Sequence, residues 1–183
     1  MKVFIAGGAG YIGSHVTLEL LDAGHEVTVY DDLSLGFLDN IDGRAKFING
    51  STLDLNLLRK SLSDNFNLVI HLAAYKAAGE SMKYPTKYSN NNLNGSINLL
   101  NLILELGIQN LIFSSTAAVY GYPKHLPIDE EHPLNPINFY GYTKLIIENL
   151  IQWYSKLGKL NYVIFRFFNA AGKDYKVLTL IHI

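Results

Sequence analysis

The sequence predicts an α/β fold with a doubly wound parallel sheet, and two observations carry this prediction. Short apolar runs alternate along the chain with segments whose apolar residues recur at helical spacing. These runs are apolar on both faces, which is typical of parallel strands covered by helices on each side. We expect the strand order 3-2-1-4-5-6, with ligands bound at the carboxyl ends of the strands, near the point where the order reverses.

The expected strands are short apolar runs that stop at a turn or at polar residues. The first runs from Val3 to Ala6 and stops at Gly7, where a glycine-rich turn begins. In chain order, the strands are expected at residues 3–6, 26–30, 45–48, 68–72, 111–113 and 162–165.

Four helices are expected between these strands. In the first, Ile12, Val16 and Leu20 share one face, and Gly24 follows its end. The helices are expected at residues 12–23, 54–64, 86–106 and 140–156. Residues 123–138 hold four of the five prolines, so we expect an irregular loop there.

Composition excludes several classes of function. The 183 residues, 49% of them hydrophobic, suffice for one domain with a buried core. Fifteen basic and 16 acidic residues leave a net charge of -1, so neither nucleic acid nor an anionic membrane is an expected partner. The absence of cysteine excludes disulfides and thiolate chemistry and suits a reducing compartment.

Neither a membrane span, a signal peptide nor a metal site is expected. No apolar run approaches the length of about 18 residues that a membrane span needs. The apolar N-terminus is interrupted by glycines from Gly7 to Gly13, which argues against a signal peptide. The six histidines lack metal-ligand spacing, so no metal is expected. We therefore expect a cytoplasmic protein.

The turn after the first strand reads Gly7-Gly8-Ala9-Gly10-Tyr11-Ile12-Gly13 and matches Gly-x-Gly-x-x-Gly. The first glycines permit a tight turn and the approach of a pyrophosphate, and Gly13 permits close packing of helix on strand. The N–H groups at the helix start favour phosphate. A glycine-rich turn without a ligand would have the same sequence, so the motif needs support from other residues.

That support comes from Asp31, at the end of the second expected strand. It follows Gly13 by 18 residues, close to the spacing of about 20 for the acidic residue that binds the adenosine ribose. On spacing alone, Asp32 is interpreted as a solvated turn residue. No Lys or Arg lies between Asp31 and Gly43, so a 2′-phosphate would find no cation. NAD is therefore favoured over NADP.

Tyr140 and Lys144 are four residues apart in the last expected helix and share one face. A nearby ammonium and a cationic nicotinamide would lower the pKa of the phenol, which could then exchange a proton near neutral pH. A surface pair without chemistry has the same spacing. Tyr120 and Lys124 form a second such pair, but Pro123 lies between them and no helix aligns the two side chains.

Ser114-Ser115-Thr116 directly follows the fifth expected strand. A hydroxyl at this edge of the sheet could hydrogen-bond a substrate oxygen and share a proton path with Tyr140, although the same residues could merely cap the strand. Together with the glycine loop and the Tyr140–Lys144 pair, they predict a hydride-transfer site.

With these motifs, the chain resembles the extended short-chain dehydrogenase/reductase family and, within it, the nucleotide-sugar 4-epimerases. The similar stretches are GGAGYIGSH at 7–15, YDDLSLG at 30–36, HLAAYKAAGES at 71–81, NNNLNG at 90–95, FSSTAAVYG at 113–121, YGYTK at 140–144 and RFFNAAG at 166–172. The competing resemblance is to nucleotide-sugar 4,6-dehydratases, which carry an acidic pair after the Thr. Ala117 and Ala118 stand there, and methyl groups cannot act as acid and base.

The resemblance implies a role for each matching residue. Tyr140 would be the catalytic base, Lys144 its electrostatic partner and Thr116 a hydroxyl that positions the substrate. Asn169 would lie near the substrate diphosphate and Phe168 beside the nicotinamide. Residues expected along NAD are Gly7, Gly10, Tyr11, Ile12, Gly13, Asp31, Asp32, Leu33, Ser34, Leu35, Gly36, Ser51, Thr52, Leu72, Ala73, Ala74, Tyr75, Lys76 and Asn91, together with Tyr140, Lys144 and Phe168. Ser51 replaces the usual Asp and is neutral, so we expect NAD to be held less tightly there than in the family.

The resemblance also implies a domain organisation. Residues 1–174 would form an NAD-binding Rossmann domain and residues 175–183 a divergent tail. Family members are nearly twice as long, and their later half supplies most of the pocket for the UDP-sugar. The expected reaction inverts C4 of a UDP-sugar through transient oxidation, but the 183-residue chain alone is expected to turn over little, as an NAD-binding remnant or as one half of an enzyme. A homodimer through the helices near 90–106 and 140–156 is also expected.

Overall fold

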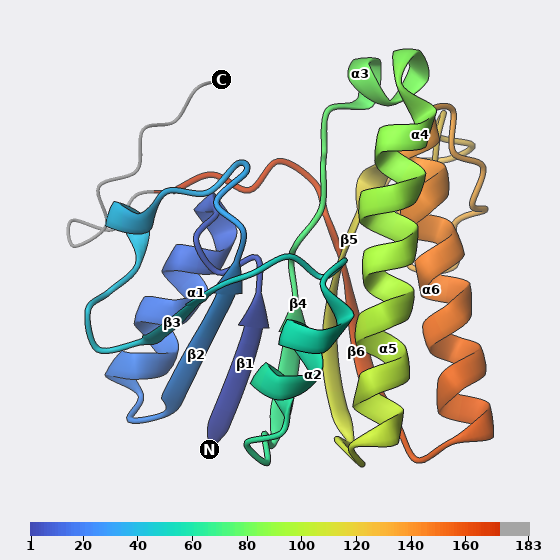
Figure 1. The fold of residues 1–183 in the computed structure, drawn as a ribbon. Helices are drawn as coiled ribbons and strands as arrows, with labels where there is room; N and C mark the ends of the chain where they lie inside the picture. Colours follow the sequence, from blue (N-terminus) through green and yellow to red (C-terminus); the bar gives the residue numbers. More distant parts are fainter. Residues whose placement is uncertain (173–183) are drawn as a thin grey trace.

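The computed structural model describes residues 1–172 and contains a six-stranded sheet in the order β3-β2-β1-β4-β5-β6 (Figure 1). All five neighbouring pairs are parallel. The predicted fold class and strand order are thus confirmed. The strands are β1 (Lys2–Ala6), β2 (Glu26–Asp31), β3 (Lys46–Asn49), β4 (Leu68–His71), β5 (Asn110–Thr116) and β6 (Asn161–Phe167).

Alternate residues of the strands supply two separate cores. Phe4 and Ala6 of β1 pack on the face covered by α2, α5 and α6, whereas Val3 and Ile5 pack on the face covered by α1. Helices on both faces explain why the strands are apolar throughout (Figure 1). These helices are α1 (Tyr11–Asp22), α2 (Leu55–Leu62), α5 (Gly95–Glu105) and α6 (Phe139–Leu157).

The edge strand β6 is less covered than the others. Ile164 packs against the larger core, but its neighbours Val163 and Phe165 are 47% and 46% exposed. Apolar side chains of this edge strand therefore face solvent.

The helix predicted at 86–106 is present as an unbroken helical stretch over residues 85–105, but its pitch changes along the way. It consists of α4 (Pro85–Tyr88), a π-helical segment, η2 (Ser89–Asn94), and α5, and a short helix that was not predicted, α3 (Ala78–Lys83), precedes it. In the π-helical segment, the side-chain amide of Asn92 accepts from the N–H of Tyr75 at 2.9 Å and donates to its carbonyl at 3.0 Å. Contacts with a distant segment therefore accompany the change in helical pitch, which the apolar periodicity does not reveal.

Two further boundaries bear on the site. Ser114, Ser115 and Thr116 are the last three residues of β5 rather than residues that follow it, because each pairs with a residue of β6. Residues 121–138 contain no helix or strand, so the predicted proline-rich loop is confirmed. A short 3-10 helix, η3 (Ala117–Val119), joins β5 to this loop, and another, η1 (Leu38–Asn40), follows β2. The predicted tail at 175–183 lies outside the described residues.

Candidate functional site

The glycine loop joins β1 to α1, and a side chain would be excluded from its positions for different physical reasons. Gly7 has a φ of +87°, and a Cβ there would lie 2.5 Å from the amide nitrogen of Ala73. At Gly13 a Cβ would lie 2.2 Å from the carbonyl oxygen of Gly7. At Gly10, by contrast, the nearest atom is that same oxygen at 3.6 Å, an ordinary contact. Packing thus requires Gly7 and Gly13, whereas Gly10 leaves open the space before α1.

This open space fits a dinucleotide phosphate. Gly10 is the N-cap of α1 and contributes no side-chain hydrogen bond to the N–H groups of the first turn. Those N–H groups, with the positive end of the helix dipole, favour an anion. A side chain at position 10 would fill the place that the anion needs.

Asp31, the last residue of β2, fastens the glycine loop to the next turn. Its carboxylate accepts hydrogen bonds from the N–H of Ala9 at 3.0 Å and of Leu33 at 2.9 Å. Burial raises the pKa of Asp31, and the two N–H donors oppose that rise. Each carboxylate oxygen has a second lone pair, so the group can still accept from ribose hydroxyls.

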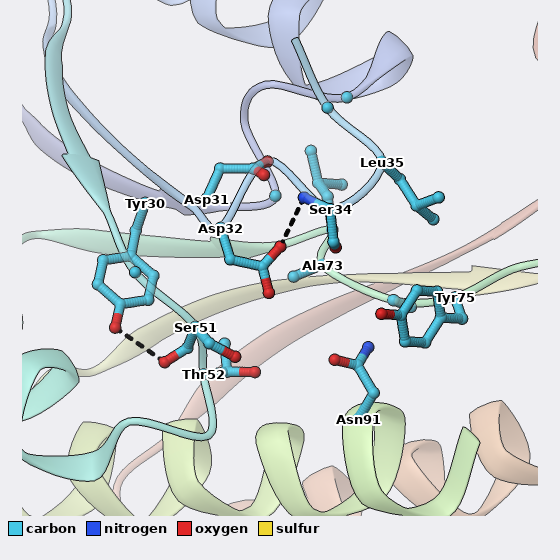
Figure 2. A pocket seen from close by; sticks show the side chains of 16 residues that line it. Tyr30, Asp31, Asp32, Ser34, Leu35, Ser51, Thr52, Ala73, Tyr75 and Asn91 are labelled. Carbon is cyan, nitrogen blue, oxygen red and sulfur yellow. Dashed lines mark hydrogen bonds between the residues drawn. The ribbon is translucent and has the colours of Figure 1, made fainter. Parts of the chain in front are cut away.

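Residues around Asp31 line a cavity of about 90 Å³. Figure 2 shows Asp31 and Asp32 on one side of it and Asn91, from the π-helical segment, across from them. Asp32 is exposed, and its carboxylate accepts a hydrogen bond from the N–H of Ser34 at 2.9 Å, as expected for a solvated turn residue. It also lines the cavity. Leu33 does not line the cavity and instead donates its N–H to Asp31.

The sequence reasoning missed Tyr30 as part of this cavity. Its hydroxyl donates to the carbonyl oxygen of Ser51 at 2.9 Å (Figure 2), and burial raises its pKa to about 12. A Cβ at Gly50 would lie 2.6 Å from the Tyr30 hydroxyl, so the ring occupies the space that Gly50 leaves. Gly50 beside Ser51 was the available sign of this close approach.

A second cavity of about 540 Å³ adjoins the first. The two share a wall made of five residues, namely Gly7, Gly10, Leu35, Leu72 and Ala74. The second cavity brings together the residues predicted for chemistry and substrate binding, which are Thr116, Tyr140, Lys144, Phe168 and Asn169. The remaining predicted residues Tyr11, Ile12, Gly13 and Lys76 also line it. The two cavities therefore lie next to each other, one lined by Asp31 and the other by Tyr140.

The start of α6 is held tightly against the end of β5. Asn138 caps the helix by accepting from the N–H of Gly141 at 2.8 Å, and the N–H of Tyr140 donates to Ser81 Oγ at 3.0 Å. A Cβ at Gly141 would lie 2.6 Å from the carbonyl oxygen of Ala118. This close approach explains the glycine that follows Tyr140 and brings the phenol to Thr116.

The phenol of Tyr140 and the hydroxyl of Thr116 both line the larger cavity. Burial raises the pKa of Tyr140, and the Thr116 hydroxyl opposes the rise. In the unliganded chain, loss of solvation thus outweighs the neighbouring groups, whereas the expected lowering applies to the site with a nicotinamide cation bound.

Lys144 is 1% exposed, and its Nζ donates to the carbonyl oxygen of Ser114 at 2.7 Å. The ammonium also lies 4.7 Å from the ring centroid of Phe113. Burial lowers the pKa of Lys144 to about 7, against an attraction from Glu148 that raises it. The lysine is thus poised between its charged and neutral forms near neutral pH.

Comparison with known proteins agrees with this geometry. The profile of the NAD dependent epimerase/dehydratase family matches residues 3–180. The chain belongs to this family. It is 46% identical over 173 residues to the UDP-glucose 4-epimerase of Lactobacillus helveticus, covering 94% of the chain and 52% of the relative. A crystal structure of the Brucella ovis UDP-glucose 4-epimerase in complex with NAD superposes with a TM-score of 0.92 at 42% identity, covering 94% of the chain and 53% of that structure.

The chain therefore spans about half the length of the relatives that it matches. Within the family, epimerases and dehydratases differ in chemistry, and Ala117 and Ala118 bear on that difference. Both lie in η3, directly after Thr116, and neither can donate or accept a proton through its side chain. In the described part of the chain, no three His, Asp or Glu side chains gather in a way that could hold a metal ion. No helix among residues 1–172 is long and apolar enough to cross a bilayer.

Proposed function

We propose that this chain carries the NAD-binding and proton-transferring half of a UDP-glucose 4-epimerase, which interconverts UDP-glucose and UDP-galactose. The single observation that supports this most is the pair of adjoining cavities, one lined by Asp31 and the other by Tyr140 and Thr116. The names of the relatives support the substrate class.

The residues that would hold NAD fall into three groups. Gly7, Gly10 and the first turn of α1 suit the pyrophosphate, since they offer N–H groups and open space. Asp31 suits the adenosine ribose, and the lining near Phe168 suits the nicotinamide. The chemistry that NAD supplies when bound is reversible hydride transfer.

The side chains of this protein would move and stabilise the proton. Tyr140 would take the proton of the sugar 4-hydroxyl, and Thr116 would hydrogen-bond the reacting oxygen. Because burial raises the pKa of Tyr140, the phenolate needs a positive charge nearby. The Lys144 ammonium supplies that charge from the same helix face. Dehydration of the sugar needs an acid and a base, and the methyl side chains of Ala117 and Ala118 can supply neither. Epimerisation is therefore favoured over dehydration.

The isolated 183-residue chain would bind NAD but turn over little. Holding a sugar with C4 at the nicotinamide can contribute about 7–11 kcal/mol to lowering the barrier. The chain matches about half of each relative, and Phe168, which lines the larger cavity, is 62% exposed. Groups beyond those described here would be needed to grip the uridine and the sugar.

A fusion tests the proposal directly. Residues 1–172 joined to the later half of the Lactobacillus helveticus relative should interconvert UDP-galactose and UDP-glucose in a coupled assay. Tyr140→Phe in that fusion should lose most of the activity while NAD remains bound. Release of a 4-keto-6-deoxy sugar would contradict the proposal in favour of a dehydratase.

Three further expectations belong to the same proposal. They are an NAD-binding domain spanning residues 1–174, a cytoplasmic location, and a homodimer through α5 and α6. The last is supported by the exposure of Trp153 and Leu157 on α6, which are large apolar side chains available for an interface.

A further inference from the structure

A serine of another helix takes part in capping α6, the helix that carries Tyr140. The first N–H groups of a helix have no partner within the helix itself. In α6, the side chain of Asn138 accepts from the N–H of Gly141 at 2.8 Å. The N–H groups of Phe139 and Tyr140, which precede Gly141, need acceptors from elsewhere in the fold.

Both acceptors come from α3, which lies against the start of α6 (Figure 1). The N–H of Tyr140 donates to Ser81 Oγ at 3.0 Å, and the N–H of Phe139 donates to Met82 Sδ at 3.3 Å. Thioether sulfur is a weak acceptor, whereas a hydroxyl oxygen is a good one. The Ser81 bond is therefore the stronger of the two, and it is made to Tyr140 itself.

The surroundings of Ser81 favour this bond. Ser81 is 0% exposed, and its hydroxyl donates to the carbonyl oxygen of Ala78 at 2.6 Å. Because the hydroxyl proton is engaged there, the lone pairs of the oxygen are left to accept from Tyr140. Water does not readily replace an oxygen that is closed to solvent, so its loss would leave the N–H of Tyr140 without an acceptor.

The carbonyl group of Tyr140 is fixed as well. It accepts from the Thr143 hydroxyl at 2.7 Å, and Thr143 is 0% exposed. Asn92 Nδ2, in the π-helical segment, donates to the same hydroxyl oxygen at 3.4 Å. Side chains from α3, from α6 and from the π-helical segment thus hold the backbone of Tyr140 in place.

Ser81 is also connected to the walls of the two cavities. Tyr75 lines the smaller cavity and Lys76 lines the larger one. The chain then enters α3 at Ala78 and reaches Ser81 within its first turn. One short segment, residues 75–81, therefore lines both cavities and ends at the contact with Tyr140.

We propose that Ser81 is a positioning residue of the site, whose hydroxyl fixes the start of α6 and thereby keeps the phenol of Tyr140 within the larger cavity. The value of this position to catalysis rests on the proposed function, but the hydrogen bond is a property of the unliganded chain. Ser81 is not one of the described residues that line the two cavities, so it acts through Tyr140 rather than on a ligand.

Two serine variants separate this role from the loss of a buried hydroxyl in general. Ser81→Ala removes the acceptor of the Tyr140 N–H and adds no atoms. Ser61→Ala is the matched control, because Ser61 is also buried in a short helix, α2, and its hydroxyl donates to the Leu57 carbonyl of that helix at 2.7 Å. Each protein is labelled with ¹³C- and ¹⁵N-tyrosine, and the NMR signals of Tyr140 are assigned by their loss in Tyr140→Phe.

Two properties of Tyr140 are measured in the unliganded chain. Its amide hydrogen should exchange about tenfold faster in Ser81→Ala, the effect of losing one hydrogen bond. The pKa of its phenol, which burial raises, should fall toward the ordinary value of about 10, because water reaches the phenol once the helix start is loosened. Neither property should change in Ser61→Ala.

Three results would overturn the proposal. One is an unchanged exchange rate of the Tyr140 amide in Ser81→Ala. The second is faster exchange with an unchanged phenol pKa, because Ser81 would then merely close a helix end. The third is an equal change of both properties in Ser61→Ala. If Ser81→Ala does not fold, Ser81→Cys decides by the same criteria, since the thiol is close in size to the hydroxyl but is a weaker acceptor.

A kinetic measurement relates this inference to the proposed function. In the fusion described above, Ser81→Ala should lower kcat by about tenfold to a hundredfold, as small displacements of a reacting group do, while KM stays near that of the parent fusion. An unchanged kcat, or an equal loss in Ser61→Ala, would contradict the positioning role. If the parent fusion has no activity, the proposed function fails, whereas the amide exchange and the phenol pKa of the unliganded chain still decide the role of Ser81.

Discussion

Lys144 Nζ donates a hydrogen bond to the carbonyl oxygen of Ser114 at 2.7 Å. This bond joins α6 to the end of β5 within the wall of the larger cavity. The position of the ammonium is thus set by the protein itself, before any ligand binds. Preorganised charge of this kind acts without reorganisation when the reaction begins.

Holding a lysine in this place should reduce the stability of the fold. Burial lowers the pKa of Lys144 to about 7 in the folded chain, against an ordinary value of about 10.4 in the unfolded chain. Between these values the unfolded state binds more protons, so the free energy of unfolding rises with pH. Lys144→Met should therefore be more stable than the wild type by about 1–4 kcal/mol at or below pH 7, as for other buried ions replaced by apolar groups.

The difference between Lys144→Met and the wild type should shrink as the pH rises toward 10. Urea unfolding of both proteins from pH 6 to 10 measures it. A difference that stays constant with pH would mean that Lys144 is not titrating in this range. Exposed Lys124→Met serves as the control and should show no such trend.

Gly10 offers a variant that should impair NAD binding without impairing folding. Its φ of -76° and ψ of 175° suit alanine, and a Cβ would meet only an ordinary contact. Gly10→Ala should be stabilised slightly, by about 0.4–1 kcal/mol. NAD affinity should nevertheless fall by about tenfold or more, or ~1.4 kcal/mol, because the methyl group enters the space for the pyrophosphate.

Two other glycines provide control variants for Gly10→Ala. Gly43→Ala, where a Cβ would meet nothing within 4 Å, should leave both stability and NAD affinity near the wild type. Gly13→Ala should fold poorly, since its Cβ would lie 2.2 Å from a carbonyl oxygen. Equal NAD affinity in Gly10→Ala and Gly43→Ala would rule out the glycine loop as the phosphate site.

Asp31 should decide between NAD and NADP. Asp31→Ala removes an acceptor for ribose hydroxyls, and losing a hydrogen bond to a charged group changes the free energy by about 1.5–3 kcal/mol. NAD affinity should fall by about tenfold or more, and the discrimination against NADP should relax because no carboxylate repels the 2′-phosphate. The exposed Asp39→Ala is the control, and calorimetric titration of both cofactors provides the measurement. Unchanged NAD preference in Asp31→Ala would contradict the assignment.

Much of the fold and part of the site could be predicted because the controlling contacts are local or periodic. The strand order follows from alternating apolar runs and helices. The relation between the glycine loop and Asp31 depends on one strand and one helix of regular length, so the spacing in the sequence reports the contact between Asp31 and Ala9. Tyr140 and Lys144 share a face for the same reason.

Features set by distant contacts could not be predicted. The π-helical segment at 89–94 accompanies the pairing of Asn92 with Tyr75, which lies in a different part of the chain. Tyr30 looks like an ordinary core residue of a strand, and only its contact with Gly50 brings it to the cavity. The raised pKa of Tyr140 depends on burial, which spacing along a helix does not give.

Calorimetric titration of NAD into the wild-type chain tests most directly whether the two adjoining cavities bind NAD. We expect saturable binding of one NAD per chain, with weaker binding of NADP. No heat of binding at millimolar NAD, from protein shown to be folded by cooperative urea unfolding, would mean that these cavities do not bind NAD.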